Sequence, residues 1–184
     1  MATNNAVNNG LSGATGTGSF VGATSPTITT PTIATSLTFS PTTGGIVGTT
    51  TNNNTAAGNV GEVISSNLPA GSATALTTAT PKNVTSISLT AGDWNVYGNI
   101  FFIPSVGASD FSAVINTTSA TFPDTSLYTQ MSAATDIFTA SNGLNAPALR
   151  ISVAGTTTVY LVALAIFGAG TCSACGNIWA RRER

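Results

Sequence analysis

One run of eleven residues, Thr157–Phe167, constrains the fold of this chain more than any other feature. Side chains alternate between the two faces of a β-strand, and in this run both alternating sets are apolar. An antiparallel strand usually has one face in water. We therefore expect one face to pack into a core and the other to meet a neighbouring subunit through a permanent apolar interface. The set assigned to the interface is Tyr160, Val162, Leu164 and Ile166.

The rest of the chain after residue 61 also favours strands. Within the run Trp94–Ile103, Trp94 and Val96 share one face, whereas Tyr97 and Phe101 share the other. A helical period of 3.6 residues is not sustained anywhere, so the sequence predicts an all-β domain over residues 61–184. The other predicted strands are Val84–Thr90, Phe111–Thr117, Ser126–Ser132, Ala148–Ala154 and Thr171–Ala180.

Charge divides the chain into two parts. Residues 1–61 hold no ionisable side chain, and all eleven charged residues follow them. Gly and Pro interrupt the first part at short intervals, between strand-like runs such as Thr32–Phe39. A lone strand with few apolar residues cannot offset its ordering entropy. We expect residues 1–60 to form an extended arm that pairs with another chain or lies on a scaffold.

Composition excludes several function classes. Charged residues make up 6% of the chain, where a soluble domain usually has about 25%. The net charge of −1 offers no footprint for nucleic acid. Histidine is absent, which removes Ser-His and Cys-His catalysis. The six carboxylates are Glu62, Asp93, Asp110, Asp124, Asp136 and Glu183. Asp93 is expected in a solvated turn, and Asp110 and Asp124 in solvated loops, so we predict no enzyme and no cofactor.

Cysteine and hydropathy add two further expectations. Cys172 and Cys175 cannot make a structural zinc site, since four ligands are needed and no other Cys or His exists. They are expected to be reduced and to face opposite sides of a strand, and the sequence assigns them no role. The longest apolar run, Val159–Phe167, is too short to span a membrane as a helix. The first residues lack the features of a secretory signal, so we expect synthesis without export and no membrane insertion.

Two regions resemble bacteriophage proteins. The stretch Leu11–Pro31, with its GATGTGSFV and TSPTITTP elements, resembles a segment that recurs in tail-fibre and related virion proteins of tailed phages. The segments Leu89–Phe102, Thr156–Ala165 and Gly176–Arg184 resemble the carboxy-terminal domains of phage tail fibres. Their order is also similar, more distantly, to the trimeric jelly roll of tumour necrosis factor and complement heads. The resemblance implies a homotrimer with an extended fibre arm and an antiparallel β-sandwich knob.

These expectations combine into one hypothesis with two alternatives. The chain is expected to be a virion fibre protein whose arm binds other virion proteins and whose knob contacts a host-surface glycan or outer-membrane receptor. A head or collar fibre or decoration protein without a receptor is the first alternative, and a polysaccharide-degrading tail spike is the second. Trp179 joins the four residues of Thr157–Phe167 as a predicted trimer contact. Receptor contacts are expected from exposed loops, and the candidate loops are Gly107–Asp110, Pro123–Ser126 and Ala140–Ala146. The carboxy-terminal arginines are expected to form a solvated or interface tail.

Overall fold

The computed structural model describes residues 50–184, of which Thr51–Arg184 form one compact unit. The arm predicted over residues 1–60 falls almost wholly outside the described residues and stays a prediction. The described strands are β1 (Val63–Leu68), β2 (Thr74–Ala75), β3 (Lys82–Leu89), β4 (Gly92–Pro104), β5 (Asp110–Asn116), β6 (Thr129–Ser132), β7 (Asn142–Val153), β8 (Thr157–Ile166) and β9 (Cys172–Arg182). Two single-turn 3-10 helices, η2 (Ala70–Ser72) and η3 (Thr125–Leu127), lie between them.

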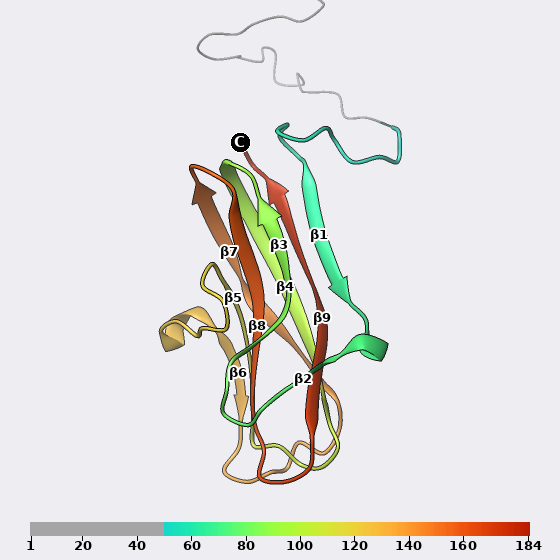
Figure 1. Ribbon diagram of the computed structural model, residues 1–184, viewed down its shortest axis with the longest axis vertical. Coiled ribbons are helices and arrows are strands. Elements are labelled where there is room, and N and C mark those ends of the chain that lie inside the picture. Colours follow the sequence, from blue (N-terminus) through green and yellow to red (C-terminus); the bar gives the residue numbers. More distant parts are fainter. Residues whose placement is uncertain (1–49) are drawn as a thin grey trace, which may run out of the picture. The chain divides into compact units, whose positions relative to one another are not determined.

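The strands form two antiparallel sheets that pack into a sandwich (Figure 1). The first sheet has the order β1-β9-β4-β7, and the short β2 also pairs with β9. The second has the order β3-β8-β5-β6. Two antiparallel sheets confirm the all-β sandwich that the sequence predicts. Eight main strands divided between two sheets in this order form a jelly roll. Within residues 50–184, no helix is long and apolar enough to cross a membrane.

The core lies between the two sheets and is built from the inward residues of nearly every strand. Val159, Leu161 and Ala163 of β8 are fully buried in it, as the alternation in Thr157–Phe167 predicts. Phe102 of β4 stacks on Phe111 of β5 with 4.6 Å between the ring centroids. Leucine-sized side chains buried this completely stabilise a fold by roughly 1.5–3 kcal/mol each. One face of the Thr157–Phe167 run therefore anchors the sandwich.

Strand ends differ from the sequence expectation where turns and prolines intervene. β7 begins at Asn142 rather than Ala148 and continues through Pro147. Proline is tolerated there because β7 is an edge strand, and the register with β4 shifts between Val96 and Gly98. β6 begins at Thr129 rather than Ser126, since Asp124 accepts a hydrogen bond from the amide of Ser126 and caps η3.

The first and last strands of the sandwich are fastened together at one end. The amide of Gly61 donates to the carbonyl of Arg182, and the amide of Arg182 donates to the carbonyl of Glu62. The Arg182 guanidinium pairs with the Glu62 carboxylate at 2.9 Å and lies 4.2 Å from the ring centroid of Trp94. Arg182 is thus buried at the end of β9, so the expected solvated or interface tail is wrong for this residue, whereas Arg181 and Arg184 are exposed.

Candidate functional site

The outward side of the first sheet carries three large, exposed aromatic side chains. Tyr97 of β4 and Trp179 of β9 are register partners whose rings stack with centroids 4.5 Å apart. They are 38% and 37% exposed, and Phe101, four residues along β4 from Tyr97, is 44% exposed. We call the outward side of β1, β9, β4 and β7 the aromatic face. Exposed rings grouped on one sheet make this face a candidate interaction surface.

A row of asparagines crosses the same face next to the stacked rings. Asn67, Asn177, Asn99 and Asn145 are successive register partners on β1, β9, β4 and β7. Hydrogen bonds from these four side chains to other described residues are absent. Each amide offers two donor hydrogens and an acceptor oxygen, and neighbouring strands are about 4.8 Å apart. The aromatic face therefore combines apolar rings with a line of hydrogen-bonding groups that are open to a partner.

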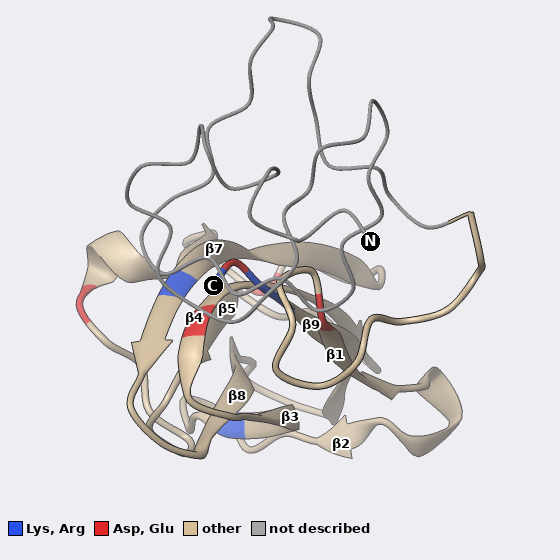
Figure 2. Cartoon of the chain, turned by 90° about the horizontal axis from the view of Figure 1, so that it is seen from above, with Lys and Arg blue, Asp and Glu red and all other residues tan. Residues whose placement is uncertain are grey.

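Charged residues of β4, β7 and β9 lie near the carboxy terminus, at one border of the aromatic face, and Figure 2 shows their places on the ribbon. Asp93 is buried and binds Arg150 and Arg184, with nitrogen–oxygen distances of 2.5 and 3.1 Å. The hydrogen bonds from Arg150 hold the pKa of Asp93 below its ordinary value. The amide of Gly58 likewise lowers the pKa of Glu62, against the effect of burial and with the help of Arg182. Asp93 was expected in a solvated turn, and that expectation is wrong because arginines from β7 and the carboxy terminus cover it.

One arginine of this border has no carboxylate partner. Arg181 is exposed on β9, two residues beyond Trp179, and pairs in register with Val63 and Asn95. Within residues 50–184 it forms neither an ion pair nor a hydrogen bond through its side chain. Its charge therefore stands at the edge of the aromatic face, available to an acidic partner.

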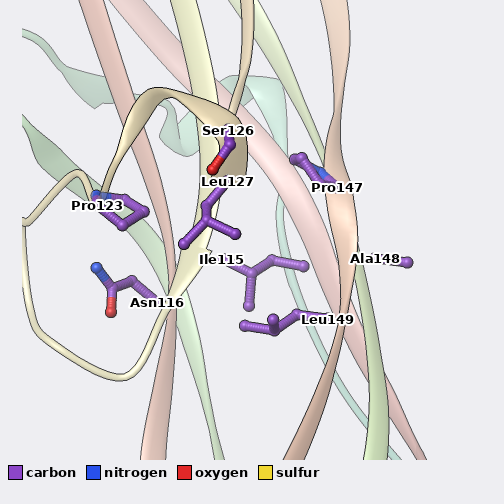
Figure 3. Close-up of a pocket in the computed structure, with 8 residues that line it drawn as sticks. All are labelled: Ile115, Asn116, Pro123, Ser126, Leu127, Pro147, Ala148 and Leu149. Atoms are coloured by element: carbon purple, nitrogen blue, oxygen red, sulfur yellow. The ribbon is translucent and has the colours of Figure 1, made fainter.

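A pocket of about 280 Å³ opens at the β7 edge of the sandwich (Figure 3). Its apolar walls come from the end of β5, the segment around η3, and the middle of β7. Leu127 at its rim is 51% exposed, whereas Ile115 is buried. The lining residues are Ile115, Asn116, Pro123, Ser126, Leu127, Pro147, Ala148 and Leu149.

The five predicted trimer contacts do not share one surface. Trp179 lies on the aromatic face, whereas the other four project from β8 on the outward side of the second sheet. Val162 is fully buried there, and its register partner Asn83 forms hydrogen bonds with Ser119 and Ala120. Tyr160 and Leu164 are half-buried and Ile166 is 42% exposed. Their role as contacts stays a prediction, and the structure brings none of them next to Trp179.

Sequence reasoning missed two members of the aromatic face. Alternation along Trp94–Ile103 already separates Tyr97 and Phe101 from the core set, and that was the available signal. Their neighbour Trp179 is 82 residues from Tyr97, so its adjacency needs the β4–β9 register.

The remaining residues and segments that the sequence singles out lie on different strands of the sandwich. Asp110 begins β5 and is buried, with its carboxylate accepting from Ser112 and Gln130. The segment 142–146, expected as loop, belongs to β7. Cys172 and Cys175 are both free and buried; Cys172 joins the core, and burial raises the pKa of its thiol to about 11. Among residues 50–184, no cluster of three or more potential metal ligands occurs.

Comparison with known proteins gives distant structural likenesses. No family model matches the chain. No curated protein matches it. Solved structures that resemble it include VP2 of infectious bursal disease virus in a subviral particle (15% identity, TM-score 0.42, 66% of this chain and 32% of that one). A chain from the structure of the Gx strain of the same virus is 15% identical with a TM-score of 0.43, over 66% of this chain and 32% of that one. The C-terminal CBM6 of LamC, a marine laminarinase from Zobellia galactanivorans, is 12% identical with a TM-score of 0.31, over 62% of this chain and 98% of that domain.

The chain spans about a third of the length of the viral proteins that it matches. None of these likenesses assigns it a function.

Proposed function

We propose that this chain is a structural protein of a bacteriophage particle, and that its sandwich is the carboxy-terminal knob of a homotrimeric tail fibre. The observation that carries the proposal is the aromatic face. A free monomer would leave Tyr97, Trp179 and Phe101 in water on one sheet. Permanent subunit interfaces are enriched in aromatic residues and depleted of charge at their centre, and this face has both properties.

The distribution of charge also supports association. The rows of the aromatic face that hold the rings and asparagines contain no Asp, Glu, Lys or Arg, and the arginines lie at its border. A monomer with so few charges is poorly protected against non-specific contact. A defined oligomer covers that surface and satisfies the asparagine row across the interface.

The arm and the receptor complete the proposal. The resemblance of Leu11–Pro31 to phage fibre segments supports attachment to other virion proteins through the amino-terminal part of the chain. The knob then contacts a glycan or an outer-membrane component on the host cell, through loops rather than through the aromatic face. A head or collar position, without a receptor, is the competing assignment.

Immunogold labelling of intact phage, combined with an adsorption assay, separates these assignments. Antibodies raised against residues 51–184 are expected to label the tail and to slow adsorption to host cells. Label on the head or collar, with adsorption unchanged, would overturn the tail-fibre assignment while leaving a structural role in the virion. Absence of the chain from purified particles would overturn the proposal altogether.

A further inference from the structure

The pocket at the β7 edge is apolar, and the aromatic face carries exposed rings that an apolar pocket can bind. Closed rings with an odd number of subunits need two different surfaces on each copy, which meet head to tail. The described part of the chain offers an exposed aromatic face and an apolar pocket. Resting on the proposed homotrimer, we infer that the pocket of each copy receives Trp179 from the aromatic face of the next copy.

Size and chemistry suit this occupant. Apolar protein cavities of about 150 Å³ take up benzene, so a pocket of about 280 Å³ has room for an indole ring. Its walls are mostly Ile, Leu, Pro and Ala side chains (Figure 3). One side of the Trp179 ring stacks on Tyr97, and the exposed part is free to enter a neighbour.

The two surfaces also lie at the same height along the strands. Val96 pairs with Leu149 and Gly98 with Ala146, which places Pro147 and Ala148 of the pocket opposite Tyr97. Tyr97 in turn pairs with Trp179. Rotation about an axis parallel to the strands leaves the height of every residue unchanged. A three-fold axis in that direction therefore brings Trp179 of one copy to the level of the next copy's pocket.

Charge complementarity supports the same pairing. Asp124 is exposed beside the pocket, between the lining residues Pro123 and Ser126, and binds no arginine or lysine among residues 50–184. Hydrogen bonds from Ser126 lower the pKa of Asp124, so it is ionised at neutral pH. Arg181, the arginine without a carboxylate partner, lies two residues beyond Trp179 on the opposing surface. The predicted contact thus joins Asp124 of one copy to Arg181 of the next around the buried ring.

Subunit exchange in the full-length protein tests the inference. ¹⁵N-labelled and unlabelled chains are mixed, and native mass spectrometry follows the appearance of mixed trimers. Leu127→Arg places a charge at the pocket rim and is expected to speed exchange by about tenfold or more. Ile137→Arg, at a residue that is 61% exposed but remote from the pocket lining, is the matched control and is expected to leave the rate within about twofold.

Charge reversal identifies the partner surfaces. Asp124→Lys and Arg181→Glu are each expected to speed exchange by about tenfold, and the double variant to return to within about threefold of the original rate. Asp136→Lys is the control, because Asp136 is also an exposed loop carboxylate that accepts a backbone amide. Circular dichroism of each variant confirms folding, and rescue in the double variant excludes a folding defect as the cause.

The outcomes separate this inference from the proposed function. A full-length protein that is monomeric overturns both. A trimer in which Leu127→Arg behaves like Ile137→Arg, or in which the two charge reversals simply add, overturns the pocket assignment and leaves the trimeric knob standing.

Discussion

Replacement of Arg182 by methionine is expected to lower the free energy of unfolding by about 3–5 kcal/mol. Arg182 is 4% exposed and donates hydrogen bonds to Glu62, to the Ala91 carbonyl at 2.7 Å and to the Thr90 hydroxyl at 2.5 Å. Methionine keeps an apolar side chain at this buried position but leaves the Glu62 carboxylate buried without a cation. Breaking a buried pair from one side costs more than the pair contributes, because the remaining charge stays desolvated.

The loss is large for a domain of this size. Such domains unfold with about 5–15 kcal/mol, and each 1 kcal/mol shifts the melting temperature by roughly 3–5 °C. Differential scanning calorimetry at one protein concentration is thus expected to show a fall of the melting temperature by roughly 9–25 °C. Lys82→Met is the control, since Lys82 is exposed and forms no ion pair among residues 50–184, and its effect should stay within about 0.5 kcal/mol.

A second substitution tests the reason for the loss. Glu62→Gln in the Arg182→Met background removes the unpaired charge and keeps an oxygen for the Gly58 amide. The double variant is expected to recover at least about 1 kcal/mol relative to Arg182→Met. If Arg182→Met costs less than about 1 kcal/mol, or if the double variant is no more stable than the single one, the buried pair does not hold the chain ends together as described.

Three further predictions follow from the same structure. Glu62, Asp93 and Asp124 have pKa values below the ordinary carboxyl value of about 4, so their ionised forms stabilise the fold above about pH 4. This stabilisation is lost as the pH falls through the lowered pKa values. The melting temperature should therefore fall on acidification below about pH 4, and a rise there would contradict the assignment. Because burial raises the pKa of Cys172 to about 11, its thiol should resist iodoacetamide at pH 8 in the folded protein and react after unfolding, as peptide mass spectrometry would show; rapid labelling of the folded protein would place it at the surface. Gly176→Ala should destabilise the sandwich by about 1–3 kcal/mol in urea titrations, since a Cβ atom would lie 2.3 Å from the Asn99 carbonyl oxygen of β4; a neutral effect would mean that β4 and β9 separate easily.

The parts of the fold that the sequence predicts are those fixed by alternation within one strand. The core face of Thr157–Phe167 and the core position of Trp94 follow from a period of two, because burial of one face selects it. β1 is the exception. Its inward Ser66 gives a polar residue where the pattern expects an apolar one, and a hydrogen bond of 2.6 Å to Thr85 compensates for it. That partner is nineteen residues away and has no local signature.

The candidate site depends on the pairing of strands, which alternation does not specify. Tyr97 and Phe101 are predicted to be outward, but the stack with Trp179 and the row of four asparagines appear only when β1, β9, β4 and β7 are placed in register. Asp93 was misplaced for the same reason, because Arg150, which covers it, is 57 residues away. Hydrophobicity alone places Trp179 and the β8 residues in one predicted trimer interface, although they lie on the outward faces of different sheets.

The mass of the native full-length protein tests the central claim most directly. Size-exclusion chromatography with light scattering measures it without any substitution or label. Three chains of 18.3 kDa give about 55 kDa, which is the predicted result for a knob that associates through its aromatic face. A folded species of 18.3 kDa that stays monomeric at increasing concentration would contradict the account, because the aromatic face would then be a stable surface in water.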